Sequence, residues 1–196
     1  MKLEVLSDRP GGGSTVLVLV RLTAPSHDGG DRRPVNLSLV IDRSSSMRGP
    51  RLKQAIDAAQ ELLGRLGPKD RLSIVSFDAN ASVICEPGPV TPERRATMQE
   101  ALERLQSGVG TNLGAALRMG ANLIKTSFVR NSISRVLLLT DGQASVGVTD
   151  NDRLTAMGEA IFKSGVAVTT MGLGQGYDDE LLIEMASRGQ GGYYYL

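Results

Sequence analysis

The chain has 196 residues and a net charge of +1, with 41% hydrophobic and 22% charged residues. These values are typical of a globular domain with a sizeable core, and the balanced charge argues against a nucleic-acid-binding surface. The single cysteine, Cys85, excludes an intrachain disulfide and a thiolate zinc cluster, and the absence of tryptophan argues against a platform that stacks bases.

The first 34 residues are predicted to form a β-hairpin extension followed by a loop. Two runs rich in β-branched residues and leucine, 2–6 and 15–23, flank a PGGG turn, and a polar loop comes after them. We expect residues 35–196 to form a separate domain. Its first strand is NLSLVI at 36–41, which is apolar on both faces and is therefore predicted to be buried on both.

Strands and helices alternate along the rest of the chain. A helix is expected from Gly49–Pro50 to Gly67, and the short turn at 78–80 requires antiparallel pairing of the strands on either side of it. In chain order, the expected elements after this helix are strands at 71–77 and 81–85, a helix from 92, a loop at 107–112 leading into a helix, a strand at 135–140, a helix at 151–164, a strand at 166–172, a helix after 178 and a last strand at 192–196.

This alternation predicts a three-layer α/β/α, doubly wound domain with a mostly parallel sheet. Right-handed connections leave 3-2-1-4-5-6 as the simplest strand order, counted from 36–41, with 81–85 as the antiparallel edge strand. The strands that end at Ile41 and Thr140 are then neighbours, and the direction of winding reverses between them. Sheets of this kind bind ligands at that switch point, beyond the carboxyl ends of the strands.

Five oxygen-bearing side chains are expected at the switch point. The segment after the first strand supplies Asp42, Ser44 and Ser46, the glycine-containing loop SGVGT supplies Thr111, and the segment after the fourth strand supplies Asp141. Carboxylate and hydroxyl oxygens are the ligands that Mg²⁺ and related cations prefer. We predict that the five side chains hold a divalent cation. Three hydroxyls with few charges suit a small octahedral ion such as Mg²⁺ better than Ca²⁺, and Mn²⁺ and Ca²⁺ stay open as alternatives.

The charge of this predicted site suggests its function. Two carboxylates balance the charge of the cation, and if one or both of them act through water, the cation stays electron-poor and lacks one ligand. An Asp or Glu side chain from a partner protein would complete the coordination shell. We therefore predict a protein-binding module for adhesion or assembly, with no catalytic residues and no organic cofactor.

On these residues the chain resembles a von Willebrand factor type A domain of the bacterial type, with the metal-ion-dependent adhesion site found in integrin I domains. The resemblance covers roughly residues 36–196. It is carried by NLSLVIDRSSSM, DRLSIVSFD, GVGTNLGAAL, RVLLLTDGQASVG and VTTMGLGQGYDDELL. It implies that the cation is bound directly by the hydroxyls of Ser44, Ser46 and Thr111. It also implies that Asp42 and Asp141 often act through water.

One residue departs from the family pattern. The family commonly has glycine between the two serines, where this chain has Ser45. A side chain narrows the backbone freedom of the loop, so we expect weaker or slower ion binding at most. The resemblance does not name the partner, because family members serve adhesion, complex assembly and cooperation with chaperone-like ATPases.

Simpler interpretations of each segment stay open at this point. The serines and Thr111 are also typical helix caps, and Asp141–Gly142 is also typical of an ordinary turn. Two other functions compete with protein binding, namely a Mg²⁺-dependent phosphotransfer enzyme with Asp42 at the metal, and a structural domain with a vestigial site. Against the enzyme, residue 44 is serine where a second acidic group would be expected.

No run in the sequence approaches the roughly 20 apolar residues of a membrane span, so we expect no direct membrane insertion by this segment. The N-terminus lacks the apolar core of a signal peptide. Together with the lone cysteine this favours the cytoplasm weakly, although a trimmed chain would look the same.

Overall fold

The structure is a computed structural model that describes residues 2–8, 17–23, 32–141, 143–174 and 178–196. It divides into two compact units, Met1–Arg32 and Arg33–Leu196. In the first unit, β1 (Lys2–Asp8) pairs antiparallel with β2 (Leu17–Thr23). The predicted N-terminal hairpin is therefore confirmed, whereas its PGGG turn lies outside the described residues.

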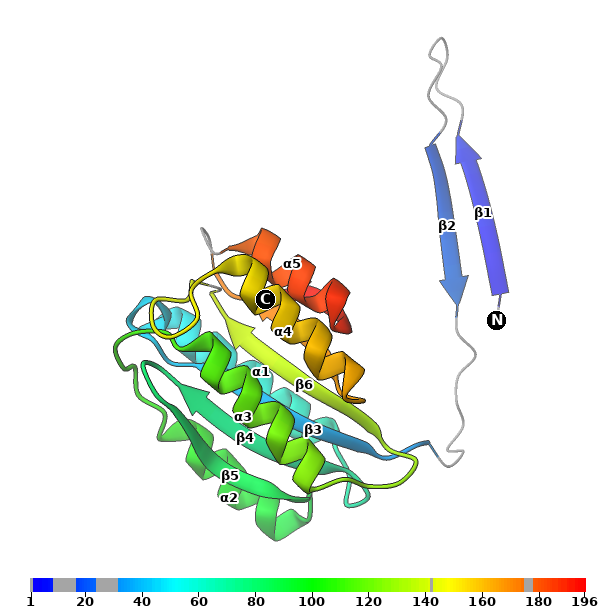
Figure 1. Cartoon of the computed structure of the whole chain (residues 1–196). Helices are drawn as coiled ribbons and strands as arrows, with labels where there is room; N and C mark the ends of the chain where they lie inside the picture. Colours follow the sequence, from blue (N-terminus) through cyan, green and yellow to red (C-terminus); the bar gives the residue numbers. More distant parts are fainter. Residues whose placement is uncertain (1, 9–16, 24–31, 142, 175–177) are drawn as a thin grey trace. The chain divides into compact units, whose positions relative to one another are not determined.

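The larger unit is built on a six-stranded sheet in the order β5-β4-β3-β6-β7-β8 (Figure 1). Only β4 and β5 pair antiparallel, and the other neighbours are parallel. Counted from β3, this is the predicted order 3-2-1-4-5-6 with one antiparallel edge strand. The strands are β3 (Val35–Asp42), β4 (Arg71–Phe77), β5 (Ala81–Pro89), β6 (Ile133–Thr140), β7 (Ala167–Gly172) and β8 (Gln190–Tyr195).

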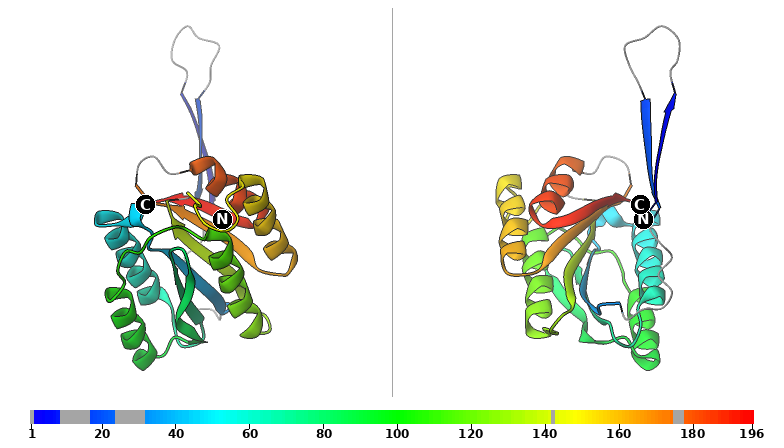
Figure 2. Two further views of the ribbon diagram at one scale, coloured as in Figure 1. Left: turned by 60° about the vertical axis from the view of Figure 1, so that its left-hand side comes forward. Right: turned by 90° about the vertical axis from the view of Figure 1, so that its right-hand side faces the viewer.

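Helices cover both faces of this sheet. One face carries α1 and α2, and the other carries α3, α4 and α5 (Figures 1 and 2). The helices are α1 (Pro50–Arg65), α2 (Pro92–Glu103), α3 (Leu113–Thr126), α4 (Asn151–Lys163) and α5 (Asp179–Arg188). In the described part of the chain, no helix is both long and apolar enough to cross a membrane.

The central strand β3 is buried on both faces, as its sequence predicts. Leu39 and Ile41 belong to the core under α1 and α2, whereas Val40 belongs to the core under α3, α4 and α5. This division follows from the alternation of side chains along a strand. Both layers of helices therefore hold β3 and the residues that follow it in a fixed position.

The edge strand β5 differs from its prediction, because it continues to Pro89 instead of ending at Cys85. Proline lacks the N–H group that a central strand needs, so Pro87 and Pro89 would not fit in a central strand. On an edge strand one side of the backbone has no neighbour to bond, and the pairing with β4 also shifts register near Ile74. These two features let β5 include both prolines.

Candidate metal centre

Asp42 lies at the carboxyl end of β3, beside the end of β6, and its side chain is fully buried. The Ser44 backbone N–H donates to its Oδ1 (2.8 Å), and the Thr140 hydroxyl donates to its Oδ2 (2.6 Å). Burial raises the pKa of Asp42 from its ordinary 3.8 to about 6, while these hydrogen bonds oppose the rise and the negative charge of Asp141 adds to it. The carboxylate is therefore held at a position that favours a nearby positive charge.

The two serines follow in a tight turn, in which residues Ser45–Met47 form the 3₁₀ helix η1. The Oγ atoms of Ser44 and Ser46 lie 3.0 Å apart. Adjacent oxygens of an octahedron with metal–oxygen distances of about 2.1 Å are also about 3.0 Å apart, so this pair matches the spacing that Mg²⁺ requires. Ser45 is exposed and is not among the described residues with a positive φ, so the serine that replaces the family's glycine causes no backbone strain.

The interpretation of these serines as caps of the proline-led helix α1 is wrong, although Ser44 stands at the N-cap position of the short helix η1. Ser44 makes no side-chain capping bond to η1, and α1 is capped instead by Gly49, again without a side-chain bond. The turn of η1 separates the serines from the start of α1, so their hydroxyls do not reach its free N–H groups. Their hydroxyls bond each other instead.

The loop before α3 is fixed by backbone hydrogen bonds to the residues that follow β3 and β4, and an ion pair joins two of these residues, Arg43 and Asp78. Arg43 Nη2 lies 2.6 Å from Asp78 Oδ2. The Gly108 N–H donates to the Arg43 carbonyl (2.6 Å), and the Asn112 N–H donates to the Asp78 carbonyl (2.7 Å). A Cβ atom on Gly108 would lie 2.0 Å from Asp78 Oδ2, so the glycine allows the loop to approach the end of β4.

Thr111 connects this loop to the segment that follows β6. Its N–H donates to Ser145 Oγ (3.0 Å), and its carbonyl accepts from the N–H groups of Ser145 (3.0 Å) and Val146 (3.1 Å). The interpretation of Thr111 as the cap of α3 is wrong, because Asn112 is the N-cap and its side chain accepts from the Ala115 N–H. The capping position falls one residue later, which leaves the buried Thr111 hydroxyl out of the cap.

Asp141 follows β6 and is 3% exposed. Its Oδ2 lies 3.5 Å from Arg51 Nη1, while its Oδ1 is buried and has no hydrogen-bond partner among the described residues. A buried carboxylate oxygen without a partner is costly, so this atom needs a cation or a donor that the described residues do not supply. Its carbonyl accepts from the Asp178 N–H (3.3 Å), which joins the loop before α5 to the same end of the sheet.

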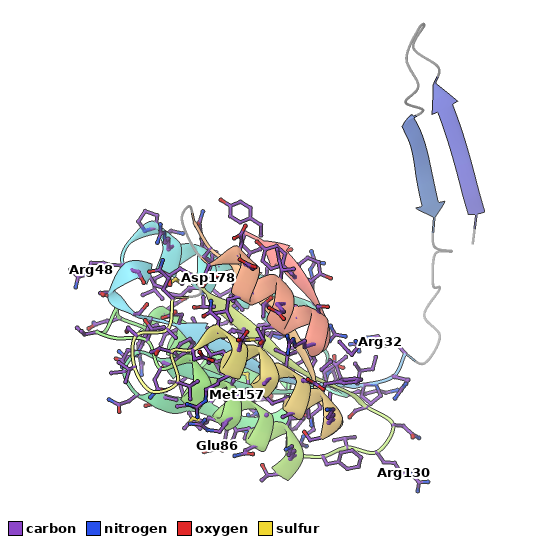
Figure 3. The ribbon with its side chains drawn as sticks, turned by 45° about the horizontal axis from the view of Figure 1, so that its top comes forward. Arg32, Arg48, Glu86, Arg130, Met157 and Asp178 are labelled. Atoms are coloured by element: carbon purple, nitrogen blue, oxygen red, sulfur yellow. The ribbon has the colours of Figure 1, made fainter. Side chains whose placement is uncertain are left out.

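All three predicted segments thus meet at one end of the domain. Figure 3 shows Arg48, which follows η1, and Asp178 at this end, away from Arg130. Hydrogen bonds link Asp42, Ser44 and Ser46, and the charge of Asp141 acts on Asp42. The backbone of Thr111 bonds Ser145 in the segment that follows Asp141.

The composition of the site also decides which ions suit it. Within the described residues, no three His, Cys, Asp or Glu side chains lie together in an arrangement that could hold a metal. The candidate site has two carboxylates, and its remaining donors are hydroxyls. Such a set fits a small oxygen-preferring cation and not a soft metal.

Sequence reasoning missed three residues that support the site. Thr140 bonds Asp42, Arg51 pairs with Asp141, and Ser145 bonds Thr111. Thr140 precedes a predicted ligand directly, so its position at the end of a strand was a usable signal. Arg51 and Ser145 gave no such signal in the sequence, because their partners are 90 and 34 residues away in the chain.

Replacing Thr140 by valine should lower the free energy of unfolding, measured by denaturant titration in chelator, by about 1–3 kcal/mol. The change keeps the shape of the side chain but leaves Asp42 Oδ2 buried without its hydroxyl donor. A serine at position 140 keeps the hydroxyl and is the matched control, which should lose clearly less stability. Equal stability of the valine and serine variants would contradict the structural role of this hydrogen bond.

The chain matches the family model described as von Willebrand factor type A domain over residues 37–143. Two of its curated relatives are bacterial. It is 34% identical over 179 residues to protein sll0103 of Synechocystis, covering 91% of this chain and 41% of that protein. It is 28% identical over 193 residues to YfbK of Escherichia coli, covering 97% of this chain and 33% of that protein. The chain therefore spans less than half the length of either relative.

Solved structures share the fold. A von Willebrand factor type A structure from Catenulispora acidiphila superposes with a TM-score of 0.74 at 20% identity, covering 92% of this chain and 41% of that one. Proximal thread matrix protein 1 from the mussel byssus, solved with a zinc-occupied MIDAS motif, superposes with a TM-score of 0.66 at 20% identity. The match covers 83% of this chain and 41% of that one. With more than half of the chain matched by the family model, the chain belongs to the von Willebrand factor type A domain family, a family of protein-interaction and adhesion modules.

Proposed function

We propose that residues 35–196 form a protein-binding module that holds a divalent cation, most favourably Mg²⁺, and binds an Asp or Glu side chain of a partner as the completing ligand. Ser44, Ser46 and Thr111 would bind the ion directly, and Asp42 and Asp141 would act mainly through water. The bound ion would supply a Lewis-acidic centre for the partner's carboxylate, and the chain would carry out no chemical step.

The observation that carries this proposal is the pair of buried carboxylates at one end of the sheet. Asp42 and Asp141 are at most 3% exposed, they raise each other's energy through charge, and Asp141 Oδ1 has no donor among the described residues. Two buried negative charges need compensating positive charge, and the single guanidinium of Arg51 beside Asp141 balances only one of them. The solved mussel protein with a zinc-occupied MIDAS motif adds support for an ion in this fold.

The geometry of Asp42 favours this function over phosphotransfer. A nucleophilic aspartate needs an oxygen that can reach an incoming phosphorus atom. Both oxygens of Asp42 accept hydrogen bonds, from Ser44 and from Thr140, and its side chain is fully buried. A carboxylate held in this way suits the fixed outer shell of a metal site, where it orients ligands or water.

The proposal is tested by metal-dependent retention of partners on the immobilised chain. Proteins of the native lysate should be retained in Mg²⁺ and released by excess chelator, and Asp141→Ala should lose this retention while its circular dichroism spectrum stays that of the wild type. Asp57→Ala is the control, because Asp57 lies exposed on α1 and pairs with Lys53 on the same helix.

Two results would overturn the proposal. The first is retention of the same proteins in excess chelator. The second is robust phosphatase turnover with Mg²⁺ that Asp42→Asn abolishes.

A further inference from the structure

A cation of the chain itself already lies against the proposed ion site. Arg51 is the second residue of α1, and its Nη1 atom lies 3.5 Å from Asp141 Oδ2 and 3.3 Å from the Ser46 carbonyl oxygen. Its side chain is 33% exposed, so the guanidinium stands at the border between the buried carboxylate and solvent. Its contacts therefore include the backbone of one predicted metal ligand and the side chain of another.

The surrounding backbone leaves room for this side chain. Gly174, just after β7, has a φ of +76°, and a Cβ atom placed on it would lie 2.3 Å from Arg51 Nε. The positive φ at this position favours glycine. The missing side chain at Gly174 thus leaves space for the guanidinium of Arg51 beside Asp141.

Other charged groups near the site are engaged elsewhere. The Arg43 guanidinium pairs with Asp78, and Arg48 donates to Ser107 Oγ. The Asp178 carboxylate accepts from the Leu181 N–H and from Asn151 Nδ2. Among the described residues, Arg51 is thus the cationic side chain that pairs with a predicted ligand carboxylate.

We propose that Arg51 is a tethered counter-cation that competes with the divalent ion for Asp141. This inference rests on the proposed function of the site. A guanidinium stays charged at all ordinary pH values, so with Arg51 in place the fixed charge near the ion is one negative unit, from two aspartates and one arginine. Arg51 thereby stabilises the ion-free domain and lowers its affinity for the ion, so that the ion exchanges more readily.

The experiment measures the dissociation constant for Mg²⁺ alone by calorimetry, together with the thermal midpoint in chelator. Arg51→Gln should bind Mg²⁺ more tightly, on the order of tenfold, because a repelling unit charge is removed a few ångströms from a ligand. Without Mg²⁺ the same variant should unfold at a lower temperature than the wild type, because Asp141 loses its counter-charge. If Arg51 had only a structural role, Arg51→Gln would lower both the affinity for Mg²⁺ and the thermal midpoint in chelator.

Two variants serve as matched controls. Lys53→Gln makes the same change in net charge two residues further along α1, at an exposed side chain that pairs with Asp57, and should change the dissociation constant less than about twofold. Arg51→Lys keeps the charge and should stay close to the wild type. An unchanged or weakened Mg²⁺ affinity of Arg51→Gln would overturn the inference while leaving the proposed function standing. Absence of Mg²⁺ binding by the wild type would overturn both.

Discussion

Saturating Mg²⁺ should raise the thermal midpoint of the wild-type chain by about 5–10 °C, and Asp42→Asn should abolish this rise. An ion that binds only the folded state at 100 times its dissociation constant adds about 2.7 kcal/mol, and a domain of this size shifts by roughly 2–4 °C per kcal/mol. The neutral amide of the variant has no charge to hold the ion or its water ligands. Differential scanning calorimetry with Mg²⁺ and with chelator measures both effects.

Without Mg²⁺ the same variant should be at least as stable as the wild type. Because burial raises the pKa of Asp42 to about 6, the folded domain holds the proton more tightly than the unfolded chain does. The ionised group therefore costs stability above about pH 6, up to about 3 kcal/mol for a shift of roughly two pKa units, and this cost declines as the pH falls through 6. Asparagine removes the charge and hence the cost.

Exposed Asp57→Asn is the control and should keep the full response to Mg²⁺. A variant at Asp42 that still gained several degrees from Mg²⁺ would show that the ion binds elsewhere. A variant that lost stability in chelator as well would show that Asp42 serves the fold itself and not an ion.

Replacing Phe77 by alanine should lower the free energy of unfolding by about 3–5 kcal/mol in denaturant titration. Phe77 is the last residue of β4, is fully buried, and belongs to the core under α3, α4 and α5. Its removal leaves a cavity at the end of the sheet that carries the site. Because its carbonyl accepts from the Arg43 N–H (2.8 Å), the segment leading to Ser44 would also lose part of its support.

Phe128→Ala is the matched control, since Phe128 lies just after α3 and is 71% exposed. This substitution should change the free energy of unfolding by no more than about 0.5 kcal/mol. Equal losses from the two substitutions would mean that Phe77 is not packed in the way the structure describes.

The sequence was sufficient to predict the order of the sheet. β3 reads as buried on both faces because each side chain of NLSLVI meets a layer of helices, and the alternation of strands and helices with right-handed connections left few topologies. The sequence also led to Asp42, Ser44, Ser46, Thr111 and Asp141 as candidate ligands, because strand ends in such a sheet converge at one edge.

Only the tertiary structure showed which of two neighbouring residues caps a helix. The sequence suggested Thr111 as a cap of α3, but the neighbouring Asn112 is also a capping residue type. The position of the loop against Asp78 places the start of α3 so that Asn112 caps it, while Thr111 faces the segment after β6. In the same way, the turn of η1 places the serines before the start of α1, so that Gly49 stands at the N-cap position of that helix.

By itself, the sequence determined the fold and the kinds of atoms expected at one end of the sheet. The spacing of hydrophobic residues and the ends of strands can both be recognised within short stretches of sequence. Only the tertiary structure decided which groups support those atoms. The hydroxyl of Thr140 reaches Asp42 across 98 residues of chain, and the guanidinium of Arg51 reaches Asp141 across 90. Contacts over such separations depend on how β3, β6 and α1 pack together, and no spacing within the sequence encodes them.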